Sequence, residues 1–237
     1  MKKIILLTLN DFKHVFRDRM LIIFLFVPVL LICFAKYFIP YITDICPAVR
    51  QFHPQIMMMG CIQTSVMFGF ITGFIILEEK DENVLQAIRV LPISAGYFIL
   101  YRFLFASFFS FSGAYSMILL VDLAWPGYWN GFLLALQYGL AAPFISLIIS
   151  TYAKNKVEGL ALFKGINLLI IIPILGFIFP GTWRYFLSFI PMFWTYKLYD
   201  DAVNNLSTLV TFLMGLLVYT AVFIFLIKEF KKRVFNN

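Results

Sequence analysis

The stretch MLIIFLFVPVLLICFAKYFIP, from Met20 to Pro40, carries one charged side chain, Lys36, in 21 positions. A run of about 20 apolar residues is long enough for an α-helix to cross the hydrocarbon core of a bilayer. Further apolar runs follow at residues 56–77, 97–121, 131–152, 160–179 and 206–227. The pattern therefore predicts an all-α integral membrane protein with six transmembrane helices.

The composition of the 237 residues supports this prediction, since 62% are hydrophobic and only 13% are charged. Such values exclude an ordinary soluble fold. Six spans leave room only for short connections, so we expect a single transmembrane domain over residues 1–237. The three cysteines, Cys33, Cys46 and Cys61, lack the spacing of metal ligands, and neither a metal site nor a disulfide framework is expected.

The basic residues are dispersed between the apolar runs, so the net charge of +7 does not indicate a nucleic-acid partner. Their distribution predicts orientation instead, because cytoplasmic loops carry an excess of Lys and Arg. With the N-terminus inside, all but four of the 19 basic residues lie in or beside cytoplasmic segments. The four are Lys36, Arg50, Arg184 and Lys197. We expect a multi-pass protein with both termini in the cytoplasm.

The segment before the first run, residues 1–19, places apolar side chains at helical spacing. These are Ile5, Leu9, Phe12 and Phe16, with polar residues on the opposite face. The pattern predicts an amphipathic elbow helix in the inner membrane interface. A short soluble cap helix is the alternative.

The segment before the last run, residues 180–205, is crowded with aromatic residues and contains Pro180 and Pro191. Aromatic side chains favour the membrane interface. We expect a re-entrant outer segment, with simple interfacial anchoring as the alternative. Phe193, Trp194 and Tyr196 are candidates for a gate at the outer end of a transport path.

Two amides and two glycines stand out within the apolar runs. Gln63 and Asn167 are candidates for lining a pathway, although hydrogen bonding between helices is the favoured explanation of such residues. Gly69 and Gly73 form a GxxxG spacing that lets backbones approach closely. Packing within one subunit is favoured over a subunit interface.

The connection between the second and third runs reads EEKDENVLQAIRVLPIS, residues 78–94. On a helix, Val84, Leu85, Ile88 and Leu91 share one face, and most of the charged residues take the other. Pro92 ends such a helix. The pattern predicts a cytoplasmic amphipathic helix that is either an interfacial connector or a docking surface.

The spacing in this helix resembles the cytoplasmic loop of ABC-2 permeases, whose usual form is approximately E-R-E-x-G-T-L-E-x-L-x-x-x-P. The same register runs without a gap from Glu79 to Pro92, with departures that include Asp81 and Asn83. The stretch from Ile190 to Tyr196 is similar to that family's proline-aromatic segment ahead of its last span. Six spans with both ends inside also match the family's topology.

The resemblance implies the permease subunit of an ABC exporter in the bacterial inner membrane. It implies pairing with a second permease subunit, identical or paralogous, and with an ATPase subunit that holds ATP and Mg. Coupling to that ATPase would involve Glu78, Glu79, Asp81, Glu82, Leu85, Ile88, Arg89 and Pro92. The chain has no G-x-x-x-x-G-K-[ST] motif, so we expect no cofactor bound by it and no enzymatic activity of its own.

Two other classes of protein are weighed against this interpretation. An ion-coupled secondary transporter or channel usually needs a carboxylate within the membrane, and none lies in the six runs. An intramembrane enzyme would need a positioned base or metal ligands, yet the two histidines, His14 and His53, both lie outside the runs. An apolar interior without fixed charge favours lipophilic or amphipathic substrates over an anionic polymer.

Overall fold

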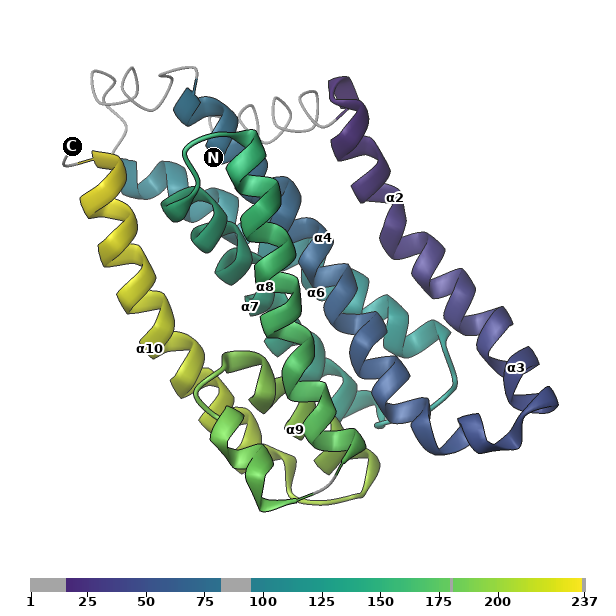
Figure 1. The fold of residues 1–237 in the computed structure, drawn as a ribbon. Coiled ribbons are helices and arrows are strands. Elements are labelled where there is room, and N and C mark those ends of the chain that lie inside the picture. Colours follow the sequence, from purple (N-terminus) through teal and green to yellow (C-terminus); the bar gives the residue numbers. More distant parts are fainter. Residues whose placement is uncertain (1–15, 82–94, 180, 236–237) are drawn as a thin grey trace.

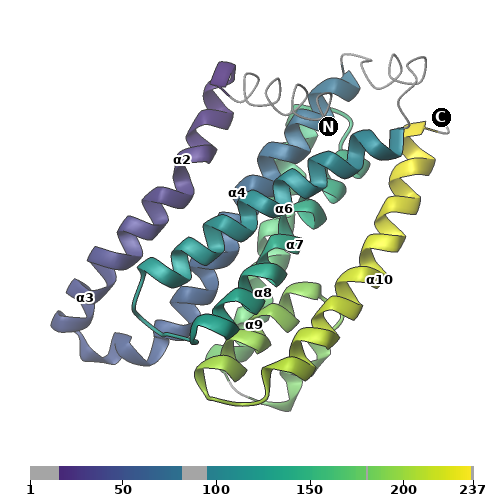
Figure 2. The same cartoon turned by 180° about the vertical axis from the view of Figure 1, so that it is seen from behind.

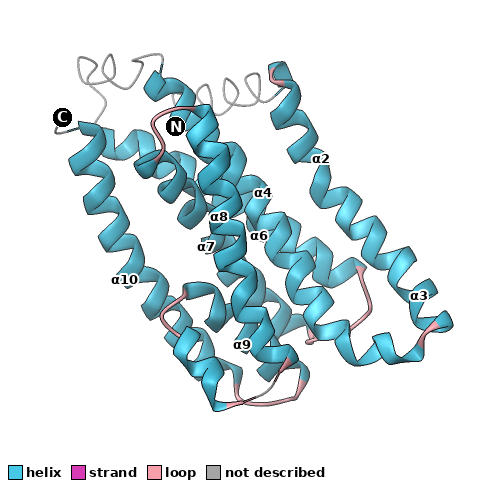
Figure 3. Cartoon of the chain, in the orientation of Figure 1, coloured by secondary structure: helices cyan, strands magenta, loops and turns pink. Residues whose placement is uncertain are grey.

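The structure, a computed structural model, describes residues 16–81, 95–179 and 181–235. Every regular element in these ranges is helical (Figure 3). The α-helices are α2 (Arg19–Cys33), α3 (Ile39–Ile45), α4 (His53–Asp81), α6 (Ala95–Leu120), α7 (Tyr128–Tyr152), α8 (Lys156–Ile178), α9 (Pro191–Val203) and α10 (Thr208–Phe235). Three short elements join them: the π-helical turn η1 (Phe34–Phe38) and the 3-10 turns η2 (Pro47–Phe52) and η3 (Thr182–Leu187).

Among the described residues, six helical stretches are long and apolar enough to cross a membrane. They are Arg19–Ile45, Pro47–Asp81, Leu100–Leu120, Tyr128–Tyr152, Lys156–Ile178 and Thr208–Arg233. We call Arg19–Ile45, which comprises α2, η1 and α3, the first span. The prediction of an all-helical chain with six candidate spans is confirmed.

The helices α4 and α7 form the centre of the bundle. In their most apolar stretches 83% and 72% of residues are buried, against 17% in the first span and 22% in α10. Figures 1 and 2 show the first span along one edge and α10 along the opposite edge. The start of α2 and the end of α10 lie at the same end of the bundle (Figure 1).

Small residues allow α4 and α7 to come close together. A Cβ added at Gly69 would lie 2.7 Å from the Ala142 carbonyl oxygen, and one added at Gly73 would lie 3.2 Å from Ser146 Cα. In lipid, the hydrophobic effect does not drive apolar helices together. Their association depends instead on close van der Waals packing of this kind. The GxxxG spacing therefore packs within the subunit, as favoured from the sequence.

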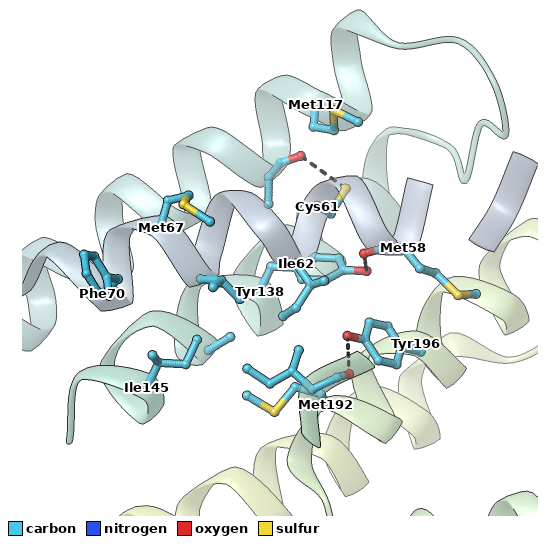
Figure 4. Close-up of a cluster of buried hydrophobic side chains, with 14 of the residues drawn as sticks. Met58, Cys61, Ile62, Met67, Phe70, Met117, Tyr138, Ile145, Met192 and Tyr196 are labelled. Carbon is cyan, nitrogen blue, oxygen red and sulfur yellow. Dashed lines mark hydrogen bonds between the residues drawn. The ribbon is translucent and has the colours of Figure 1, made fainter. Parts of the chain in front are cut away.

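The core between α4, α7 and α9 is apolar and contains buried tyrosines with bonded hydroxyl groups (Figure 4). Tyr138 Oη donates to the Met58 carbonyl oxygen at 3.5 Å, and Tyr196 Oη donates to the Ile170 carbonyl oxygen at 2.9 Å. A buried hydroxyl without such a partner is costly. These bonds tie α9 to α8, and α7 to α4.

The helices differ from the expected spans mainly in length. Helix α4 begins three residues before the expected start at 56 and includes Glu78–Asp81, which were assigned to the cytoplasmic connection. Helix α10 runs to Phe235, eight residues beyond its apolar run. Hydropathy marks the part of a helix that suits lipid, and a helix can continue past it into water.

Several expected segments are described only in part. Residues 1–15 of the expected elbow helix and residues 82–94 of the expected coupling segment lie outside the described residues. Residues 181–205 contain η3 and α9, which fold back against the ends of α8 and α10. The expected re-entrant course of this segment stays a prediction.

A matched pair of glycine substitutions tests the α4–α7 contact. Gly69→Ala should lower the free energy of unfolding by about 1–3 kcal/mol, because its methyl group meets backbone atoms of α7. Gly165→Ala is the control, since nothing lies within 4 Å of its Cβ position, and it should be neutral or stabilise by up to about 1 kcal/mol. Thermal unfolding in detergent would compare the two, and equal midpoints would contradict the tight contact.

Candidate functional site

An apolar cavity of about 760 Å³ lies between the first span, α4 and α8, with one contribution from α6. All but three of its lining residues are apolar or glycine, and the three exceptions are Gln55, Gln63 and Asn167. Two of these exceptions, Gln63 and Asn167, were singled out from the sequence as candidates for a pathway. The structure brings them together from α4 and α8.

The three amides form a polar strip on the α4–α8 side of the cavity. Gln63 Nε2 donates to Asn167 Oδ1 at 3.3 Å, and Gln55 Nε2 donates to the Phe177 carbonyl oxygen at 2.9 Å. Oε1 of Gln55 and Oε1 of Gln63 are buried and have no hydrogen-bond partner among the described residues. Buried acceptors of this kind are rare and call for an explanation. A ligand with hydrogen-bonding groups would supply one.

The opposite wall of the cavity is the first span, including the π-helical turn η1. Phe34 and Ala35 of this turn and Ile39 of α3 face the cavity. The first span packs mainly on α4, and the helix α8 lies across the cavity from it. A π-helical turn within a longer helix is frequent at functional sites. Of the three main walls, the first span is the least buried, with 17% of residues buried in its most apolar stretch against 39% in that of α8.

At the end of the bundle where α2 begins and α10 ends, ion pairs connect four helices. We call this group, made up of Asp18, Glu78, Glu79, Lys80, Arg102 and Lys156, the charged end. Lys156, the first residue of α8, lies 3.0 Å from Glu78 Oε1 on α4 and 3.5 Å from Asp18 Oδ2 ahead of α2. Lys156 therefore links α8 to both α4 and the first span.

The next two residues of α4 reach two further elements. Both carboxylate oxygens of Glu79 accept from the guanidinium of Arg102 on α6, and Arg102 is only 2% exposed. Lys80 Nζ donates to the Ala153 carbonyl oxygen, between α7 and α8, at 3.1 Å. A bidentate arginine–carboxylate pair fixes geometry as well as charge. The last turn of α4 is thereby tied to α6, α7 and α8.

The residues predicted for ATPase coupling are placed only in part. Glu78 and Glu79 belong to the charged end, and Asp81 is exposed as the last residue of α4. The remaining five, Glu82, Leu85, Ile88, Arg89 and Pro92, lie outside the described residues.

The aromatic residues predicted as a gate lie away from the cavity, at the opposite end from the charged end. Phe193 and Tyr196 of α9 are fully buried, and Trp194 Nε1 donates to the Ser188 carbonyl oxygen at 2.8 Å. None of the three lines the cavity. The ring of Phe193 lies 5.7 Å from that of Phe177, next to the cavity residue Ile178.

Helix α9 also carries an acidic residue, Asp200, whose pKa is shifted. Burial raises the pKa of the Asp200 carboxyl above its usual value, while the Arg184 guanidinium, 3.9 Å away, opposes the shift. Asp200 does not line the cavity. Within residues 16–81, 95–179 and 181–235, no group of three or more His, Cys, Asp or Glu side chains could hold a metal ion.

Reasoning from the sequence missed three residues of these sites. Gln55 lies one position before the expected start of the second span, outside the apolar run. Arg102 lies inside an apolar run, and a charged residue in such a run indicates that it has a partner of opposite charge. Lys156 could not be matched to Glu78 across 78 positions of sequence.

Two neighbouring carboxylates allow a test of the charged end. Glu79→Gln should cost about 2–4 kcal/mol of unfolding free energy, because it removes a charge partner from the buried guanidinium of Arg102. Glu78→Gln should cost less than about 1 kcal/mol, because the side chain of its partner Lys156 is 44% exposed. Denaturant titration in mixed micelles would measure both, and a larger loss for Glu78→Gln would refute this ranking.

Comparisons with known proteins place the chain in a family. A family model described as fluoroquinolones export permease protein Rv2686c-like matches residues 11–227. The fluoroquinolones export permease proteins MT2760 and Rv2686c, from the CDC 1551 / Oshkosh and H37Rv strains of Mycobacterium tuberculosis, are each 24% identical over 218 residues. Each alignment covers 89% of this chain and 86% of the relative. No solved structure matches. The chain thus belongs to the Rv2686c-like family of export permease proteins, which it matches over nearly its whole length.

Proposed function

We propose that the chain is the membrane-spanning permease subunit of an ABC-2-type exporter that carries fluoroquinolone-like compounds out of the cell. The observation that carries this proposal is the cavity between the first span, α4 and α8. Its volume of about 760 Å³ falls within the range of about 300–1,000 Å³ that is usual for sites of drug-sized ligands.

The chemistry of the cavity suits an amphipathic aromatic substrate. A fluoroquinolone has a planar aromatic ring system, which apolar walls can bind, and keto and carboxylate oxygens, which accept hydrogen bonds. The amides of Gln55, Gln63 and Asn167 carry both donors and acceptors on one side of the cavity. The names of the two mycobacterial relatives, both fluoroquinolones export permease proteins, agree with this class of substrate.

A separate ATPase subunit, which binds ATP and Mg, is the proposed source of energy. The chain lacks a phosphate-binding loop, and its sequence from Glu79 to Pro92 resembles the cytoplasmic loop of ABC-2 permeases. Glu78 and Glu79 lie in the last turn of α4, directly before residues 82–94. In this proposal the charged end faces the cytoplasm, together with both termini, and the protein lies in the plasma membrane.

A second permease subunit, identical or paralogous, would complete the path. The helices on either side of the cavity expose large apolar side chains. Examples are Ile23 and Leu30 of α2, at 65% and 64% exposure, and Leu168 of α8, at 65%. A partner subunit that covers these helices would close the cavity away from lipid.

Drug accumulation in cells that express the permease with its neighbouring ATPase tests the proposal directly. Efflux should depend on ATP and should survive dissipation of the proton gradient. Efflux that instead stops with the proton gradient and continues without ATP would favour an ion-coupled secondary transporter or channel. Absence of any efflux would reject the proposed substrate class.

Adjacent isoleucines of α8 provide a matched test of the cavity. Ile171 lines it, whereas Ile172 does not and is 38% exposed. Ile171→Trp should lower the efflux rate at least about fivefold, because the larger ring occupies space needed by the substrate. Ile172→Trp should leave efflux within about twofold of wild type. Equal losses in both variants at equal membrane levels would reject the cavity as the path.

Coupling to the ATPase is tested within residues 82–94. Leu85→Pro would interrupt the expected amphipathic helix and should abolish both copurification with the ATPase and substrate-stimulated hydrolysis. Asp81→Lys changes the charge of an exposed position just before that segment and should weaken both measures without altering membrane insertion. Reversal of Glu78 or Glu79 is a poorer choice, because it also breaks pairs inside the subunit. Normal copurification and hydrolysis with Leu85→Pro would count against the coupling role.

A further inference from the structure

His53 connects three segments at the end of the bundle opposite the charged end. It is the first residue of α4, and its Nε2 lies 2.9 Å from Thr43 Oγ1 on α3. Its Nδ1 lies 3.2 Å from the carbonyl oxygen of Leu123, in the connection between α6 and α7. One imidazole ring at the start of α4 therefore contacts both the far end of the first span and the connection between α6 and α7.

These bonds lie directly beside the cavity. Ile39, one helical turn before Thr43, lines the first-span side, and Phe52 and Gln55, which flank His53, line the α4 side. Thr43 itself is only 5% exposed. The Thr43–His53 bond therefore spans the two walls of the cavity at this end, and separation of the first span from α4 here requires its loss.

The donors and acceptors around the ring define the tautomer of its neutral form. The Leu123 carbonyl oxygen can only accept, so Nδ1 must carry a proton. Thr43 Oγ1 lies 2.9 Å from the Ile39 carbonyl oxygen, to which its hydroxyl can donate. When it does so, Oγ1 accepts from a protonated Nε2 and the ring is an imidazolium. When the ring is neutral, the Thr43 hydroxyl turns and donates to Nε2 instead.

Both protonation states keep the contact, but with different strength. Hydrogen bonds from a charged donor are roughly twice as strong as neutral ones. The charged residues next to these partners in the chain are Asp44, Arg50 and Asp122, all exposed, and α4 has no charged residue at this end. Among the described residues, the hydrogen-bond partners of the ring are Thr43 and Leu123.

We propose that His53 is a positioning residue that holds the first span against α4 at this end of the cavity, and that protonation of its ring tightens this closure. The inference rests on the proposed function, in that it takes the cavity for the substrate path. Histidine is the side chain that ordinarily changes charge between about pH 5 and 8. The cavity would then open less readily at this end in acid.

Access to the cavity can be measured without any substrate. Met59 lines the cavity, and Met59→Cys provides a reporter thiol in a chain that also carries Cys33→Ser and Cys46→Ser. Cys61 is fully buried and can stay. The rate of maleimide labelling of this thiol in membranes at about pH 5.5 and about pH 7.5, on both sides of the ordinary histidine transition, reports how often the cavity opens.

Two variants separate the bond from the charge. His53→Gln retains a donor and acceptor near the position of Nε2 but does not titrate. Labelling of the chain with His53, divided by labelling of the His53→Gln chain at the same pH, cancels the pH dependence of the thiol itself. This ratio should fall about threefold from pH 7.5 to pH 5.5 as the bond becomes charge-assisted. A ratio that does not change with pH would overturn the proposed effect of protonation.

Thr43→Val removes the hydroxyl with little change of shape and should raise labelling about fivefold at pH 7.5. Its control is Thr208→Val, which removes a comparable bond between helices, from Thr208 Oγ1 to Asn130 Oδ1 at 3.0 Å, whose residues do not line the cavity. Labelling should be unaffected in the control. Equal rates for Thr43→Val and the unaltered parent would overturn the closure itself. Loss of drug efflux in every chain, with labelling as expected, would reject the proposed function and leave the role of His53 intact.

Discussion

The approach of α4 to α7 at Gly69, where a single methyl group would meet backbone, is the contact on which the rest of the structure depends. It fixes α4 in the middle of the bundle. This one helix therefore contributes residues to sites along the whole length of the molecule. The first residue of α4 is His53, its first half provides Gln55 and Gln63 to the cavity, and its last turn contributes to the charged end. The first span packs mainly on this central helix.

The spans could be predicted from the sequence because the ability to cross a bilayer is a local property of about 20 residues. Gln63 and Asn167 could be singled out because amides are rare in such runs. Their pairing across 104 positions could not be foreseen, since it depends on which helices are neighbours. Gln55 was missed because it lies at the edge of an apolar run, where hydropathy alone does not mark the helix start.

Polar pairs complement small residues in specifying how the helices pack. In lipid, apolar side chains gain little by choosing one neighbour over another. The Arg102–Glu79 pair and the bond from Gln137 Nε2 to the Phe212 carbonyl oxygen, at 3.0 Å, each join two particular helices. A buried ion pair contributes little net stability, yet separation of its partners is costly. Such pairs penalise every alternative register of α4 on α6 and of α7 on α10.

The π-helical turn η1 determines the direction in which the later residues of the first span point around the helix axis. Relative to a continuous α-helix, the extra residue rotates the chain beyond Phe38 by about 100°. Ile39 faces the cavity and Thr43 meets His53 in that rotated setting. The number of residues between Phe34, which also faces the cavity, and Thr43 is therefore constrained by angle and not only by membrane thickness. Single-residue insertions or deletions between them should be rare during evolution, even where the apolar character of the sequence drifts freely.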